Sequence, residues 1–170
     1  MLSLLAVGVL VLGGCGSSNS GGGGGTTSAE ISGGNKTAPT QISDATINLT
    51  PSRDSGVNGT ATFLNGNGAV QVDLKVQNLP DDPGTEHPAH IHQGGTCADD
   101  RAGNEAPIQV PLNSVITQED GTGTSTTTIE GTQVVELFSG TPRYVNVHAV
   151  KTGESTPPGI SCADLPLGEP

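Results

Sequence analysis

Aromatic residues are scarce in this sequence of 170 residues, which has no Trp, one Tyr and two Phe. The core must therefore be built from Val, Ile, Leu and Ala. Aliphatic residues that recur at every second position are how β-sandwiches and barrels are filled. The 26 glycines and 12 prolines agree with many turns. The composition predicts one domain of ordinary size, large enough for a real core.

Positive charge is also scarce, because 6 Lys and Arg residues face 17 Asp and Glu residues and the net charge is −11. Nucleic acids and anionic membrane surfaces repel such a chain, so neither is expected as a partner. The sequence also has no long amphipathic helix, no phosphate-binding glycine loop and no Ser-His-Asp arrangement with a supporting motif. The charge itself mainly predicts solubility.

An apolar run at residues 2–12 is too short to span a bilayer and ends at Leu12-Gly13-Gly14-Cys15. It resembles a bacterial lipoprotein signal with its lipobox. The resemblance implies a signal peptide at residues 1–14, a lipid on Cys15, and an extracytoplasmic protein that meets the cell membrane through this lipid only. An export signal normally carries Lys or Arg before its apolar run. This chain has neither there, so the true start could lie upstream of Met1. A buried strand or helix is the alternative interpretation.

The stretch that follows, residues 15–40, has almost no apolar content and contains five consecutive glycines. As a flexible coil it would reach about 25–30 Å, enough to hold a domain off a membrane surface. We expect a lipidated tether at 15–40 and a folded domain at 41–170.

Alternating apolar and polar residues predict several strands within this domain. The expected strands are residues 45–50, 59–64, 70–76, 87–92, 107–112, 122–129 and 143–150. The prolines of 107–112 suit an edge strand. Residues 134–138 do not alternate and indicate a helical turn or a packed connection. Seven or eight short strands joined by turns make an all-β sandwich or flattened barrel.

Three of the four histidines fall within residues 87–92. In a strand, His90 and His92 leave the same face while Ile91 points to the opposite one. In the strand at 143–150, His148 lies opposite the valine face. If the aliphatic faces form the core, the three imidazoles of His90, His92 and His148 could converge outside the barrel wall as metal ligands. A chance polar strand edge is the alternative.

The cysteine count is consistent with an exported protein. If Cys15 carries the lipid, Cys97 and Cys162 remain as an even pair. A disulfide is the expected state of such a pair in an oxidising compartment. Two separate free thiols are the alternative.

Residues 42–165 resemble a bacterial copper/zinc superoxide dismutase. The sequence His87-Pro88-Ala89-His90-Ile91-His92 resembles the family's His-Gly-Phe-His-(Val/Ile)-His motif, and Tyr144-Val145-Asn146-Val147-His148 resembles the strand that ends in the last copper ligand. Cys97 and Cys162 stand at the places of the disulfide that anchors the active-site loop.

The resemblance implies a Greek-key β-sandwich or flattened barrel of about eight strands. It also implies that His90, His92 and His148 hold copper and are catalytic through it, and that His87 steadies the copper strands without being a ligand. The substrate would be superoxide, with copper taking an electron from one superoxide and giving it to the next.

The chain departs from the family in two places. No histidine lies between Cys97 and Thr117, where the family carries its zinc ligands, so zinc at the usual site is not expected. Asn104 or Glu105 stands near the place of the bridging histidine, and Glu105 could be a weak extra oxygen ligand or a solvated loop acid. The arginine that guides the anion, just before the second cysteine, is absent; Arg101 or Arg143 could substitute.

Three functions from different classes remain open. The first is a zinc-free, copper-dependent superoxide dismutase, an oxidoreductase on a tether, whose turnover could be slow. The second is a non-enzymatic copper-binding lipoprotein. The third is a metal-free interaction module similar to chordin-type CHRD domains, which share a His-x-His strand and a Tyr-Val-Asn-Val-His ending. The cysteine pair belongs to the dismutase pattern and favours the first two.

Overall fold

The computed structural model describes residues 44–153 and 156–168. These residues all belong to one unit of the chain, Thr37–Pro170. The predicted signal peptide, the tether and Cys15 lie outside the described residues. In the described part of the chain, no helix is both long enough and apolar enough to span a membrane.

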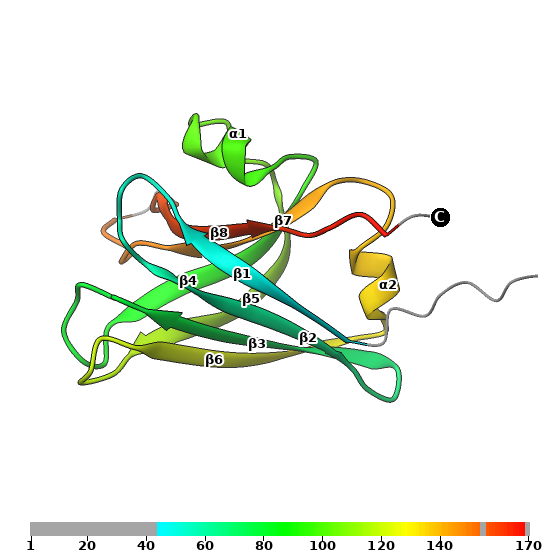
Figure 1. Ribbon diagram of the computed structural model, residues 1–170, viewed down its shortest axis with the longest axis horizontal. Helices are drawn as coiled ribbons and strands as arrows, with labels where there is room; N and C mark the ends of the chain where they lie inside the picture. Colours follow the sequence, from blue (N-terminus) through cyan, green and yellow to red (C-terminus); the bar gives the residue numbers. More distant parts are fainter. Residues whose placement is uncertain (1–43, 154–155, 169–170) are drawn as a thin grey trace, which may run out of the picture. The chain divides into compact units, whose positions relative to one another are not determined.

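Eight antiparallel strands close into a barrel, as the all-β prediction requires (Figure 1). The strands are β1 (Asp44–Pro51), β2 (Asn58–Asn65), β3 (Ala69–Gln77), β4 (Glu86–Gln93), β5 (Ile108–Thr117), β6 (Gly123–Glu130), β7 (Arg143–His148) and β8 (Gly159–Asp164). Two short helices, α1 (Cys97–Arg101) and α2 (Val134–Leu137), lie in the connections.

The order of strands around the barrel is β1-β2-β3-β6-β5-β4-β7-β8. Strands β4, β5 and β6 are neighbours in the order of the chain. The last of them, β6, lies beside β3, the strand that precedes all three in sequence, which is a Greek-key arrangement. The long connection from β6 to β7 places β7 against β4. This second crossover is what brings His148 next to the strand that carries the other histidines.

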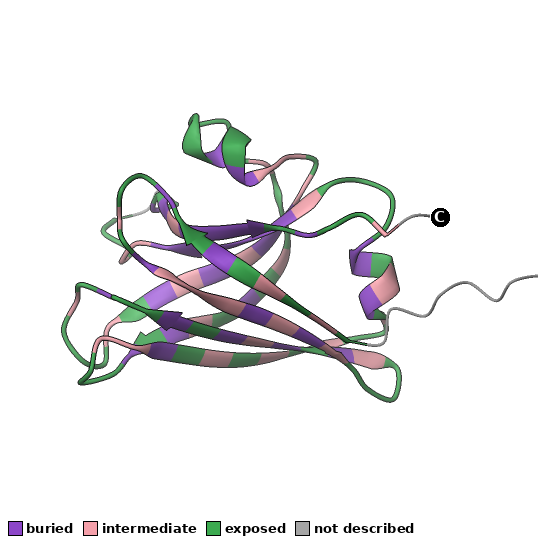
Figure 2. Ribbon diagram, viewed as in Figure 1, coloured by how far each residue is buried: buried purple, intermediate pink, exposed green. Residues whose placement is uncertain are grey.

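Aliphatic side chains fill the barrel at every second position. In β3, Val70, Val72, Leu74 and Val76 are buried, while the side chains between them are exposed or half-buried, and the same alternation is visible along other strands in Figure 2. Both phenylalanines are in the core, where the rings of Phe63 and Phe138 meet edge to face at 5.1 Å. The core is therefore aliphatic with few rings, as the composition indicated.

Strand β5 is longer than the predicted strand. At its C-terminal end it pairs with a neighbouring strand on each side. It pairs with β4 from Ile108 to Ile116, but with β6 only at Ile116 and Thr117. The half that contains Pro111 thus has one free side, which is where a residue without an N–H is tolerated. The prediction of an edge is correct for this half of the strand only.

Two further elements were not predicted. The first is α1, whose first turn is closed by a capping box between Thr96 and Asp99. Strand β8 pairs with β1 and β7 and so completes the closure of the barrel. The predicted helical turn at 134–138 is present as α2.

A disulfide joins Cys97, the first residue of α1, to Cys162 in β8, as the cysteine pair predicted. The Arg53 guanidinium adds a second tie, because it binds the Asp100 carboxylate at 2.9 Å and the Gly159 carbonyl at 3.1 Å. Helix α1 and the chain on either side of it are therefore fastened to β8.

Replacement of both cysteines, Cys97→Ser with Cys162→Ser, is expected to lower the free energy of unfolding. The two residues are 65 apart in sequence, and on the loop-entropy model a loop of this length contributes about 4 kcal/mol. Urea unfolding at pH 7, followed by far-UV circular dichroism, measures the difference. A loss below about 1 kcal/mol would contradict the expectation.

Candidate metal centre

The register between β4 and β7 places five polar side chains on one face of the sheet. His92 is opposite Tyr144 and His90 is opposite Asn146, and His148 follows at the end of β7. Side chains alternate between faces along a strand, so all five leave the same side. The other face presents pairs such as Ile91 with Val145, which are both fully buried in the core. The predicted convergence outside the barrel wall is what the strand geometry produces.

The three imidazoles lie outside the barrel core but are not exposed to solvent as a group. His92 and His148 are 0% exposed and His90 is half-buried. Register shifts in the β4–β5 and β7–β8 pairings flank the histidines, next to His92 and His148. Such irregularities re-aim side chains locally. The site is therefore enclosed, with His90 at its more open side.

Hydrogen bonds fix which nitrogen of each buried ring is free. Nδ1 of His92 donates to the Ala106 carbonyl at 2.7 Å, and Nδ1 of His148 donates to the Pro157 carbonyl at 2.7 Å. A carbonyl oxygen only accepts, so each Nδ1 carries a hydrogen and each Nε2 of the neutral ring presents a lone pair. This is the second-shell arrangement that orients histidine ligands of metals.

Three ring nitrogens have no hydrogen-bond partner among the described residues: Nδ1 of His90 and Nε2 of His92 and His148. Each of these atoms is buried. Buried polar atoms are rarely left unpaired in folded proteins, and a bound cation would provide the missing partner. The arrangement fits a metal, since all three atoms are potential ligands.

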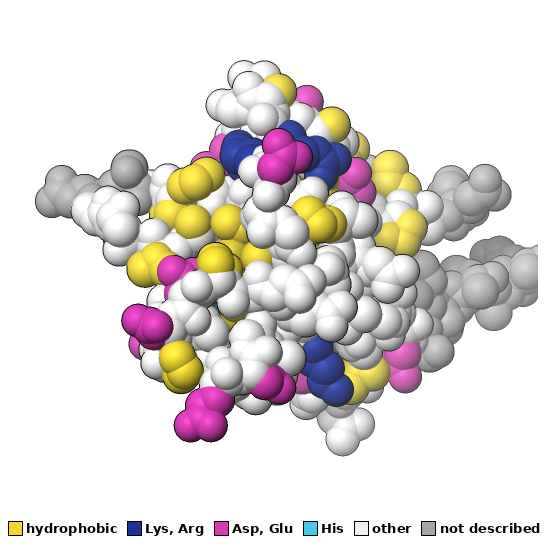
Figure 3. All heavy atoms as spheres, turned by 60° about the vertical axis from the view of Figure 1, so that its left-hand side comes forward, with side chains coloured by type: hydrophobic (Ala, Val, Ile, Leu, Met, Phe, Trp, Pro, Cys, Tyr) yellow, Lys and Arg dark blue, Asp and Glu magenta, His cyan; other side chains and the backbone are white. Residues whose placement is uncertain are grey.

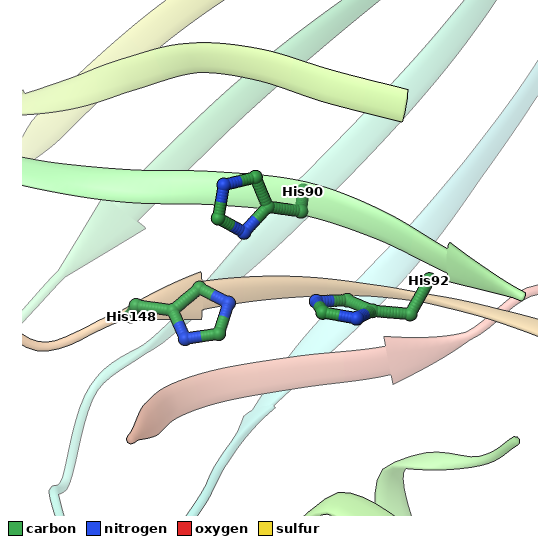
Figure 4. Close-up of side chains that lie close together, drawn as sticks. All are labelled: His90, His92 and His148. Carbon is green, nitrogen blue, oxygen red and sulfur yellow. The ribbon is translucent and has the colours of Figure 1, made fainter. Parts of the chain in front are cut away.

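The three rings turn toward a common space (Figure 4). One ligand atom from each ring lies within 4.8 Å of the others, and these three histidines could together hold a metal ion. The ring centroids of His90 and His148 are 5.0 Å apart. Ligands at about 2.0 Å from one ion lie about 3.3 to 4 Å from each other, so small ring rotations bring this set to bonding distance.

Burial and repulsion between neighbouring rings lower the pKa of His90 and His148. Burial, followed by repulsion from the neighbouring His148 and His92, lowers the pKa of His90 to about 4. Burial also lowers the pKa of His148, against the opposing effect of its hydrogen bond to Pro157. Metal ligation requires the neutral ring, so the environment favours the form that binds a metal at neutral pH.

His87 plays a different part. Its Nδ1 lies 3.1 Å from the His148 carbonyl and its Nε2 lies 3.1 Å from the Thr117 hydroxyl. Asp81 lies 3.5 Å from the same Nε2. Both ring nitrogens therefore have partners, and the ring links β4 to the end of β7 and to β5.

Tyr144 holds one side of the cluster in place. Its ring stacks on His92 with centroids 4.7 Å apart and planes at 5°. Its hydroxyl accepts a hydrogen bond of 3.1 Å from the N–H of Ala106, whose carbonyl binds His92. Ala106 is thus held at both its N–H and its carbonyl.

Glu105, the residue before Ala106, reaches the cluster. Its Oε1 lies 3.6 Å from Nε2 of His92 and 3.8 Å from Nε2 of His148. Its side chain is 31% exposed. The sequence left this residue open between an oxygen ligand and a solvated acid, and the structure brings its carboxylate to the two unpaired nitrogens.

Neither arginine that could have replaced the missing guiding residue contacts the cluster in the described part of the chain. Arg143 is bonded to Gln109 and to nearby carbonyls, and Arg101 is exposed at the end of α1. A third arginine, Arg53, binds the carbonyl of Gly159, the residue paired with His148. Its charge is offset by the buried carboxylate of Asp100.

The surface charge is mixed where basic residues occur. On the face drawn in Figure 3, the dark-blue Lys and Arg side chains near the top and near the lower edge have acidic side chains close by. This face has no broad positive field that would concentrate a small anion.

Comparison of the chain with models of known protein families finds no match, and comparison with curated proteins finds none either. The assignment of a function therefore rests on the residues and their geometry.

Sequence reasoning placed Tyr144 and Asn146 on the histidine face without giving them a role, and it missed Arg53. Tyr144 and Asn146 alternate with His148, so the period-two pattern already placed them on the histidine face. The Asn146 amide is buried and has no hydrogen-bond partner among the described residues. Arg53 belongs to the turn after β1 and gave no signal, because its partners are 47 and 106 residues away.

The His90 ring of the metal-free protein is expected to titrate near pH 4, because its pKa is lowered mainly by burial. Below pH 6.5 the unfolded chain binds the proton that the folded ring refuses, so stability is lost as the pH falls from about 6.5 to 4. NMR of the histidine ring protons, after removal of metal by a chelator, measures the midpoint.

The control is His90→Gln, which should remove this resonance and reduce the pH dependence of unfolding between 6.5 and 4, with the contribution of His148 remaining. A His90 midpoint close to 6.5 would show that the ring is solvated and that the cluster is open.

Proposed function

We propose that the protein is an exported, membrane-tethered copper-binding protein of the superoxide dismutase type, which removes superoxide. The observation that carries the proposal is the set of three buried, unpaired ring nitrogens that β4 and β7 direct toward one point. The resemblance of the two histidine motifs supports it, as does the eight-strand Greek-key order.

Copper is the metal that this set of ligands favours. Imidazole nitrogens suit copper and zinc, and a given nitrogen site binds Cu(II) more tightly than Zn(II). The segment between Cys97 and Thr117 has no histidine for a separate zinc site. One metal, held by His90, His92 and His148, accounts for the residues present.

Bound copper would supply the electron transfer, by accepting an electron from one superoxide and returning it to the next. The chain supplies position and access. The carbonyls of Ala106 and Pro157 orient His92 and His148. The Cys97–Cys162 disulfide anchors the covering segment, which is the connection from Cys97 to Ala106, to β8. The half-buried His90 leaves the open side, so a small anion would approach there.

The charges of the protein attract that anion only weakly. Steering by positive charge raises association rates by a factor of about 10 or more, and this chain has a net charge of −11. The charge of Arg53, which binds the carbonyl of Gly159 beside His148, is offset by Asp100. Slow turnover is expected. Because the net charge repels the anion and the charge of Arg53 is offset, a non-enzymatic copper-binding role is the second candidate.

The lipid on Cys15 and the extracytoplasmic location are part of the proposal. The Cys97–Cys162 disulfide supports them, because disulfides persist mainly in oxidising compartments. Copper and superoxide would meet the domain at the outer side of the cell membrane.

Titration with Cu(II), followed by electron paramagnetic resonance, is expected to show one site with three nitrogen ligands. His90→Gln and His148→Gln should each weaken Cu(II) binding by about 100-fold or more, because each removes one of three ligands. The matched control is His87→Gln, whose ring nitrogens are already hydrogen-bonded, and which should keep the site within about tenfold. Circular dichroism checks that each variant folds.

The copper-loaded protein is then assayed for superoxide removal. Activity above that of the buffer and of His148→Gln supports the dismutase. Stoichiometric binding without activity would contradict the enzymatic reading and leave a copper-binding lipoprotein. Absence of copper binding would overturn both and leave a metal-free interaction module.

A further inference from the structure

Glu105 faces two atoms that cannot donate to it. The Nδ1 hydrogens of His92 and His148 are used by the carbonyls of Ala106 and Pro157, so each neutral ring turns a lone pair toward the carboxylate. Three acceptors that face one point repel each other. A cation among them removes this conflict.

The distances from the Glu105 carboxylate to the two rings are longer than those of a hydrogen bond. Oε1 of Glu105 is 3.6 Å from one Nε2 and 3.8 Å from the other. A proton between donor and acceptor would draw the heavy atoms to about 2.7–3.2 Å. Ligands of one four-coordinate ion, each about 2.0 Å from it, lie about 3.3 Å apart. The observed separations lie closer to the second geometry.

The position of Glu105 is fixed by its neighbour. Tyr144 binds the N–H of Ala106, and His92 binds its carbonyl. The backbone next to Glu105 is therefore tied to a ring of the cluster itself. In the part of the chain that the structure describes, no Lys or Arg forms an ion pair with Glu105, and the charged or titratable groups close to its carboxylate are the imidazoles of His92 and His148.

We infer that Glu105 is the fourth ligand of the bound ion and that its carboxylate makes the site hold Cu(II) more tightly than Cu(I). The inference rests on the proposed copper site. Carboxylate oxygen is a hard, negatively charged ligand, which stabilises the divalent ion more than the monovalent one. The consequence is a lowered copper reduction potential, set by this single side chain.

The test compares Cu(II) and Cu(I) affinities of the full chain, Glu105→Gln and Glu105→Asp. Glu105→Gln removes the charge but keeps the shape. Its Cu(II) affinity should fall by about 10- to 100-fold, with Cu(I) affinity, measured against a colorimetric chelator, changed by less than about threefold. The copper potential should then rise by about 59 mV for each tenfold loss of Cu(II) affinity. The electron paramagnetic resonance spectrum of Cu(II) in Glu105→Gln should differ from that of the unaltered chain, while the number of nitrogen ligands stays at three.

Glu105→Asp separates ligation from a field effect. The Asp side chain keeps the negative charge but is shorter by one methylene. The bond from the carboxylate to the metal would therefore be lost, while the electrostatic effect of the charge through space would be largely kept. Its Cu(II) affinity should fall nearly as far as that of Glu105→Gln. The matched control is Glu130→Gln, an exposed acid at the end of β6 that removes the same charge, and it should leave both affinities unchanged.

Two failures can be told apart. If the unaltered chain binds no copper, the proposed function fails. If the chain binds copper but Glu105→Gln binds both oxidation states as well as the unaltered chain, only the role of Glu105 is overturned. Full Cu(II) affinity in Glu105→Asp would likewise contradict ligation by this side chain.

Discussion

Two hydrogen bonds from imidazole to backbone carbonyl determine the chemistry of this molecule. They place the ring hydrogens of His92 and His148 on Nδ1 and thereby leave both Nε2 lone pairs pointing inward. With Nδ1 of His90, they form a buried cluster of acceptors that no described donor satisfies. Such a cluster is costly in an empty protein, because each atom loses its hydrogen bonds to water without a replacement. A bound metal ion would offset this cost by accepting the three lone pairs.

The fold brings the ligands together through one crossover. His90 and His92 are separated from His148 by more than fifty residues of chain, and only the placement of β7 beside β4 makes them neighbours. The covering segment is fixed by the disulfide at Cys97 and by the contacts of Ala106 with His92 and Tyr144. The donor atoms are thus positioned by rigid strands on one side and by a fastened loop on the other, which is the arrangement that a preorganised metal site requires.

The sequence was sufficient for the strands, the aliphatic core, the cysteine pair and the set of three histidines, because all of these follow from alternation, residue type and count. It was insufficient for β8, whose few residues follow two prolines and do not alternate clearly in burial. It also could not assign the free nitrogen of each ring, since this depends on the carbonyls of Ala106 and Pro157. The contact of Glu105 with the cluster depends on the same loop conformation. Long-range pairings such as that of Arg53 with Asp100 have no local signature.

The central claim is that one metal ion lies among three imidazoles outside the barrel wall. Diffraction data from crystals of the copper-loaded protein, collected on both sides of the copper absorption edge, test it most directly. The account predicts one anomalous peak about 2.0 Å from Nδ1 of His90 and from Nε2 of His92 and His148. A copper peak elsewhere, or none at this cluster while copper is bound in solution, would contradict it.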